Sequence, residues 1–304
     1  MSWMECPQAG EHEAGNQAVE LAIVPRTSDI GGLEVRRALP SRQRRMVGPF
    51  VFFDQMGPSR LGPGEGLDVR PHPHIGLATI TYVFSGEILH RDSLGHVQPI
   101  RPGELNWMTA GRGIAHSERT PDALRSSGPE LSGIQTWIAL PHELEETKPA
   151  FIHHARGVMP GIEEKDWRAH LICGNQWGQQ SPVETFTETL YADVVMQVNA
   201  QVPVDASVEE RALYVYSGAV EIGGQRHESG QLLMLRPGDE VTVKALEPVR
   251  MMLIGGEPMD GPRHIWWNFV SSRKDRIEQA KADWKAGRFD AVIGETEFIP
   301  LPER

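Results

Sequence analysis

Tyr82-Val83-Phe84-Ser85-Gly86 in the first half of the chain recurs as Tyr214-Val215-Tyr216-Ser217-Gly218 in the second half. Each copy is followed by a strand-like segment, a turn and an apolar run that begins with glycine, at 103–108 and at 230–235. A repeated order of elements indicates a duplicated structural unit. The repeat therefore predicts two copies of one β-fold in tandem, with a shorter hairpin in the second copy.

The segments around the repeat have the length and composition of strands. Short apolar or alternating runs separated by turns lie at 78–84, 87–90, 105–108 and 134–140. This spacing is typical of barrels and sandwiches rather than of βαβ units. We therefore expect an all-β fold, divided into a polar tail at 1–18, a first barrel at 19–145 and a second barrel at 146–304.

One helix is predicted near the end of the chain. Ser272 followed by Asp275 resembles a capping box. Apolar residues then recur at helical spacing, and Gly287 is placed to end the helix; the helical face is Ile277, Ala280, Lys281 and Trp284. We expect an amphipathic helix that packs on a barrel through Trp284 and carries no chemistry.

Composition limits the possible partners and location. The 304 residues suffice for about two domains of ~150 residues each, and 39% hydrophobic residues supply two cores. A net charge of -11 argues against direct nucleic-acid binding, which needs clustered basic residues. Two cysteines, no signal peptide and no run of ~18 apolar residues favour a cytoplasmic protein without a membrane segment.

Two pairs of side chains carry the candidate chemistry. His72 and His74 stand at i and i+2, and so do His116 and Glu118. Side chains at this spacing share one face of a strand, so each pair can point into a barrel interior. We expect the two strands to face each other across the barrel and to deliver four ligands to one metal ion. Three imidazoles and a carboxylate suit Fe, Mn, Ni, Cu or Zn and leave coordination positions open.

A lone His-x-His is more often a pair of surface histidines, and the second pair is what favours a metal site. A purely structural metal is disfavoured, because such sites usually have four tight ligands, often cysteine. The repeat supplies an internal comparison. It places Val204 and Ala206 at the positions of the first pair, and Thr242 and Lys244 at those of the second, so the second barrel is expected to hold no metal.

The sequence resembles the pirin family, whose members have two barrels and belong to the cupin superfamily. The resemblance covers nearly everything after the tail. Its most specific parts are Pro71-His72-Pro73-His74, Asp92-Ser93-Leu94-Gly95-His96, Asn106-Trp107-Met108-Thr109-Ala110-Gly111-Arg112-Gly113-Ile114 and His116-Ser117-Glu118. It implies two tandem cupin (jelly-roll β-barrel) domains plus a C-terminal helix. Cupins usually carry a further Glu after the His-x-His, but Leu77, Ala78 and Thr79 stand there, so no fifth ligand is expected.

The resemblance implies an iron site made of His72, His74, His116 and Glu118, with Fe(II) the expected metal. It also implies two alternative functions. One is a quercetin 2,3-dioxygenase acting on a flavonol-like substrate and O2, in which Glu118 is also a candidate catalytic proton shuttle. The other is a regulatory protein that binds another protein according to the metal's redox state. For the enzyme we expect Phe53, Met56 and Trp107 at the barrel mouth, although core packing is the commoner role for Trp107.

Overall fold

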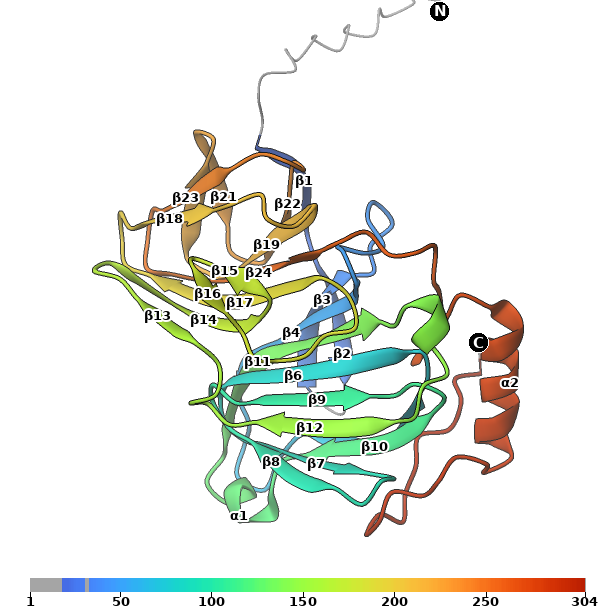
Figure 1. Cartoon of the computed structure of the whole chain (residues 1–304). Coiled ribbons are helices and arrows are strands. Elements are labelled where there is room, and N and C mark those ends of the chain that lie inside the picture. Colours follow the sequence, from blue (N-terminus) through green and yellow to red (C-terminus); the bar gives the residue numbers. More distant parts are fainter. Residues whose placement is uncertain (1–17, 31–32, 304) are drawn as a thin grey trace, which may run out of the picture.

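Strands dominate the part of the chain that the structure describes, residues 18–30 and 33–303 of a computed structural model. The polar tail predicted at 1–18 lies outside these residues, except for Ala18. The strands form two barrels that lie one above the other in Figure 1, with the single long helix beside the lower one. The all-β prediction, with tandem cupin barrels and one C-terminal helix, is confirmed.

The first barrel combines a seven-stranded and a four-stranded sheet, both antiparallel. The larger sheet has, in spatial order, β12 (Ala150–His154), β9 (Leu105–Thr109), β6 (Leu77–Ser85), β11 (Glu130–Ala139), β4 (Phe50–Arg60), β3 (Leu33–Leu39) and β2 (Arg26–Ile30). The smaller sheet has β5 (Asp68–His74), β10 (Ile114–Arg119), β7 (Ile88–Asp92) and β8 (Val97–Ile100). Two short helical turns adjoin this barrel, at α1 (Asp122–Arg125) and His142–Leu144.

The second barrel repeats this arrangement strand for strand. Its larger sheet has β1 (Val19–Ile23), β22 (Gln231–Leu235), β19 (Glu210–Ser217), β24 (Val249–Gly256), β17 (Thr189–Met196), β14 (Trp167–Cys173) and β13 (Gly161–Glu163). Its smaller sheet has β18 (Gln201–Val204), β23 (Val241–Ala245), β20 (Ala219–Ile222) and β21 (Gln225–Glu228). Two small hairpins complete the strands, β15 (Asn175–Gln176) with β16 (Gln179–Gln180), and β25 (His264–Trp266) with β26 (Phe269–Ser271).

The first strand of each half pairs into the other half's sheet. β1 precedes the first barrel in sequence but pairs with β22 of the second barrel. β12 opens the second half but pairs with β9 of the first barrel. The strand pairing therefore departs from the division expected at 145 and 146, because the two halves exchange equivalent edge strands.

The register of the second barrel corrects one detail of the repeat comparison. On β23 the buried residues are Val241, Val243 and Ala245, which pack in an aliphatic core. Lys244 lies on the outer face, with its ammonium 3.9 Å from Glu221. The expectation that Lys244 occupies the position of Glu118 was wrong by one residue, and a one-residue shift moves a side chain to the other face of a strand.

The long helix α2 (Lys274–Lys285) packs as predicted but begins differently. Ile277 and Ala280 are buried in a cluster with Trp284, and Gly287 follows the helix with a positive φ of 67°. Arg273 is the N-cap, without a side-chain cap bond. The predicted cap, Ser272, instead donates its hydroxyl to Glu145. No helix of the described residues is long and apolar enough to cross a bilayer.

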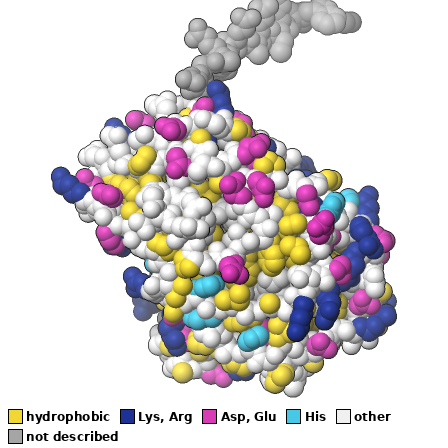
Figure 2. Space-filling model, in the orientation of Figure 1, with side chains coloured by type: hydrophobic (Ala, Val, Ile, Leu, Met, Phe, Trp, Pro, Cys, Tyr) yellow, Lys and Arg dark blue, Asp and Glu magenta, His cyan; other side chains and the backbone are white. Residues whose placement is uncertain are grey.

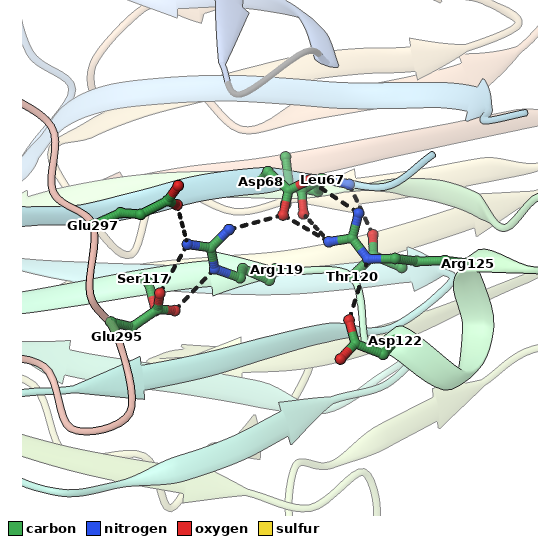
Figure 3. A network of polar contacts seen from close by, with 9 residues as sticks. All are labelled: Leu67, Asp68, Ser117, Arg119, Thr120, Asp122, Arg125, Glu295 and Glu297. Carbon is green, nitrogen blue, oxygen red and sulfur yellow. Dashed lines mark hydrogen bonds and ion pairs between the residues drawn. The ribbon is translucent and has the colours of Figure 1, made fainter. Parts of the chain in front are cut away.

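The segment after α2 returns across the first barrel, where a network of ion pairs holds it (Figure 3). Arg119 of β10 donates Nε and Nη2 to the two oxygens of Glu295, at 2.9 and 2.8 Å. It donates Nη1 to Asp68 of β5 at 2.9 Å, and Arg125 also donates to Asp68. Farther along, the Ile299 amide donates to the Pro71 carbonyl at 2.8 Å. The C-terminal segment therefore lies against the two strands that carry the histidine pairs.

Acid is expected to release this segment. Hydrogen bonds from Arg119 hold the pKa of Glu295 below its ordinary value of 4.5. Burial alone would raise the pKa of Asp68, but Arg125 and Arg119 outweigh it and lower the pKa. Because both folded-state pKa values are depressed, the stabilisation is present above about pH 5 and is lost as the pH falls through the folded values. Hydrogen exchange at 290–301 should therefore accelerate on acidification.

Two variants test this assignment at neutral pH. Glu295→Gln should accelerate exchange over the same residues, because the Glu295 side chain is 9% exposed and faces Arg119. Glu297→Gln should have little effect, because that side chain is 55% exposed and water screens its ion pair. Equal effects of the two variants would contradict the role given to Glu295.

Candidate metal centre

The three predicted histidines converge inside the first barrel. His72 and His74 lie on β5, and His116 lies on β10 with its Cα opposite His72. Prolines at 71 and 73 fit here because β5 is an edge strand, and proline cannot donate a ladder hydrogen bond. β5 and β10 are neighbours in one sheet, so the expectation that they face each other across the barrel was wrong. The shared face of the two strands still brings the imidazoles together.

The ligand atoms of His72, His74 and His116 lie within 4.8 Å of one another. His74 Nε2 and His116 Nε2 are 3.1 Å apart. Two nitrogens bound ~2.1 Å from one ion at adjacent positions would be ~3 Å apart. The three side chains are at most 6% exposed. Their spacing and burial therefore fit a metal ion, and within residues 18–30 and 33–303 no other cluster of this kind is found.

Burial keeps the three imidazoles neutral, which is the form that binds metals. Removal from water lowers the pKa of His72 and takes the pKa values of His74 and His116 well below their ordinary value. Neighbouring imidazoles lower the last two further, because each disfavours a second positive charge.

Outer contacts direct one nitrogen of His72 and one of His116 toward the centre, whereas Nδ1 of His74 has no hydrogen-bond partner within the described residues. His72 Nδ1 donates to the Arg70 carbonyl at 2.9 Å, which leaves Nε2 as the ligand atom. His116 Nδ1 lies 3.4 Å from His90 Nδ1, and His90 Nε2 lies 3.1 Å from Asp92 Oδ2. If His90 donates to the carboxylate, its Nδ1 accepts from His116, and His116 Nε2 is free to bind a metal. The buried β7 residues His90 and Asp92 therefore orient a ligand on β10.

Glu118 reaches the same pocket but not the compact histidine group. Its carboxylate accepts from Gln135 Nε2 at 3.0 and 2.8 Å and from Thr81 Oγ1 at 3.1 Å. A register irregularity separates it from His116 on β10. It lines the cavity together with His72 and His74. The structure thus brings three of the four predicted ligands together, and Glu118 as a fourth ligand stays a prediction.

The cavity beside the histidines has a volume of about 510 Å³, within the range of small-molecule sites. Phe52 and Trp137 form an aromatic wall, with ring centroids 3.9 Å apart and planes at 9°. Trp267 and Asn268 enter from the C-terminal hairpin, and Ile299 from the returning segment. Trp267 has a positive φ of 52°, an uncommon conformation for a bulky residue. Residues from the end of the chain therefore help to enclose a site built in its first half.

The apolar residues expected at the barrel mouth lie elsewhere. Phe53 and Trp107 belong to the apolar core between the barrels, where Phe53 packs on Tyr214. Met56 lies in a separate cluster with Val35 and Leu131. Side chains alternate along β4, so Phe52 faces the cavity while its neighbour Phe53 faces the other barrel.

Sequence reasoning missed the residues that support the ligands. His90 and Asp92 repeat the i and i+2 spacing of the ligand pairs, and this signal was available in the sequence. Gln135, Thr81 and Trp137 had no such signal, because only the sheet register places them beside Glu118 and His74.

Two tandem jelly-roll barrels with a three-histidine cluster in the first define a bicupin with a candidate metal centre. Residues 32–138 match the Pirin family, and residues 191–290 match the Pirin C-terminal cupin domain. The chain belongs to the pirin family.

Known relatives agree with this assignment. A pirin-like protein of Caulobacter vibrioides is 48% identical over 94% of this chain and 100% of its own length. The crystal structure of a quercetin 2,3-dioxygenase from Acinetobacter baumannii has a TM-score of 0.84 at 34% identity, covering 93% of this chain and 96% of that one. A bacterial pirin of Escherichia coli, solved in complex with nickel(II), shares the fold with a TM-score of 0.61 at 19% identity, over 79% of this chain and 99% of that one.

Proposed function

We propose that this protein is a metal-dependent dioxygenase of the quercetin 2,3-dioxygenase type, which oxidises a flavonol-like substrate with O2. The observation that carries the proposal is a buried three-imidazole cluster that opens into an aromatic-walled cavity. The similarity to the Acinetobacter baumannii quercetin 2,3-dioxygenase supports the substrate class.

The donor set suits one divalent transition metal, with Fe(II) proposed first and Mn, Ni, Cu or Zn as alternatives. His72, His74 and His116 would hold it, with Glu118 as the proposed fourth ligand. The nickel(II) complex of the Escherichia coli pirin supports a divalent metal. A metal bound here would act as a Lewis acid toward the oxygen of a deprotonated enol.

The protein's own residues would bind and orient the substrate. Phe52 and Trp137, which stack on each other in the cavity wall, would give an aromatic ring system apolar contacts. Arg37, which lines the same cavity, lies 4.3 Å from the centre of the Phe52 ring and is fixed by an ion pair with buried Asp54. Glu118 Oε2 would accept the substrate's hydroxyl proton, with Gln135 and Thr81 holding the carboxylate in position.

Anaerobic addition of quercetin to the Fe-loaded protein tests the proposal. A change in the absorption spectrum is expected, because the deprotonated flavonol would enter the metal's coordination sphere. Admission of air should then consume the flavonol, together with O2 measured by an electrode. The His116→Ala variant is the matched control and should show neither response. Absence of any spectral change with several flavonols would overturn the enzyme assignment and favour redox-dependent binding of a protein partner.

A further inference from the structure

A second cavity lies between the two barrels, separate from the candidate metal centre. Its volume is about 390 Å³, and both barrels contribute to its walls. Tyr82 and Phe84 come from β6 of the first barrel. His170, Asp193 and Arg250 come from β14, β17 and β24 of the second barrel.

The wall of this cavity carries a buried polar network. The Tyr82 hydroxyl lies 3.0 Å from His170 Nδ1 and donates to Asp193 Oδ2 at 3.3 Å. Arg250 donates to both oxygens of Asp193, at 2.9 and 2.6 Å, and its guanidinium lies 3.5 Å above the Phe84 ring. Tyr82 and Asp193 are 2% and 5% exposed. The charge of Asp193 is therefore already balanced by Arg250 within the wall.

Two further arginines line the cavity without such a partner. Arg156 and Arg168 are exposed. Within the described part of the chain, no hydrogen bond or ion pair joins either guanidinium to another side chain. Burial raises the pKa of Tyr82 and lowers the pKa of His170, and the positive charge of Arg156 acts in the downward direction on both groups. The wall holds three arginines (Arg156, Arg168 and Arg250) against two carboxylates (Glu163 and Asp193), a net charge of +1. A concave site with excess positive charge concentrates anions.

We propose that this interdomain cavity binds a small organic anion through the guanidinium groups of Arg156 and Arg168. The recognised group is an oxyanion, a carboxylate or a phosphate, because the planar fork of arginine pairs with either in a bidentate manner. Glu163 also lines the cavity and carries the opposite charge. The volume exceeds that of a bare ion, which leaves room for an organic body beside the oxyanion.

The anion site is distinct from the metal centre. On β6, the hydroxyl of Thr81 donates to Glu118 in the metal cavity, whereas the next residue, Tyr82, faces the interdomain cavity. Neighbouring residues of a strand point to opposite faces, so β6 is the wall between the two sites. Binding in one cavity therefore requires no ligand in the other.

Titration of the metal-loaded full chain with inorganic phosphate, and separately with succinate, tests the proposal. Saturable binding by calorimetry and a rise in melting temperature are expected for one or both probes. A response to phosphate alone identifies a phosphate ester as the ligand class, and a response to succinate alone identifies a carboxylic acid. Arg156→Gln and Arg168→Gln should each weaken binding about ten- to a hundredfold, as expected for loss of a charged hydrogen-bonding partner.

Two controls locate the binding. Arg226→Gln removes a positive charge from the exposed strand β21 of the second barrel, where Arg226 pairs with Glu228. It should leave the affinity for the anion unchanged. His116→Ala should also retain anion binding, which separates this site from anion ligation of the metal. Failure of both probes to bind saturably at millimolar concentration would overturn the proposal. Binding that survives both arginine substitutions would overturn it equally.

Discussion

His116→Ala is expected to remove bound metal from the purified protein. The substitution removes the imidazole whose Nε2 lies 3.1 Å from Nε2 of His74. Two histidines then remain in the cluster. Loss of an outer-shell partner typically costs ten- to a hundredfold in metal affinity, and loss of a direct ligand should cost more. Elemental analysis of protein purified without chelator measures the change.

The second barrel should stay folded in the same variant, because its aliphatic core has no contact with His116. Thermal melting should show a folded protein with a lower melting temperature than the wild type. His227→Ala is the matched control, since His227 is a buried histidine on β21 of the second barrel. It should leave the metal content unchanged. Equal metal content in the His116 variant and the wild type would remove the basis of the proposed activity.

Glu145→Gln is expected to lower the free energy of unfolding by about 3 kcal/mol, since breaking one side of a buried ion pair typically costs ~3–5 kcal/mol. Glu145 Oε1 lies 2.9 Å from Arg263 Nε, and the two side chains are 5% and 0% exposed. The lower end of the range applies because Arg263 also pairs with Asp260. Glu145 further accepts hydrogen bonds from Ser271 and Ser272, so it joins the start of α2 to the first barrel. Denaturant unfolding measures the loss.

The adjacent residue provides the control. Glu146 pairs with Arg276 but is 53% exposed, so Glu146→Gln should cost less than ~1 kcal/mol. Similar losses in the two variants would show that burial does not govern the strength of these ion pairs.

The fold was largely predictable because its signals are local and duplicated. Tyr82 and Tyr214 do lie on equivalent strands, β6 and β19, and the turns around them are marked by glycine. The exchanged edge strands were not predictable. β1 and β12 have ordinary strand compositions, and the sequence of a strand alone does not determine which sheet edge it pairs with.

The candidate site was partly predictable, because side chains at i and i+2 of a strand point to the same face. His72, His74 and His116 converge because each points inward from a strand. Glu118 follows a register irregularity, which spacing cannot reveal, and its carboxylate is held by residues from two other strands. The interdomain cavity had no sequence signal, since its residues belong to five strands and several loops spread over both halves of the chain. Acidic and basic side chains are interspersed over the face shown in Figure 2.

The reciprocal placement of β1 and β12 makes the chain resemble a domain-swapped dimer whose two subunits have been fused. Neither half is then a self-sufficient module. Cutting the chain between the halves would leave β22 or β9 with a bare edge, and bare edges invite pairing with other molecules. Each barrel therefore depends on a strand that the other half of the chain supplies.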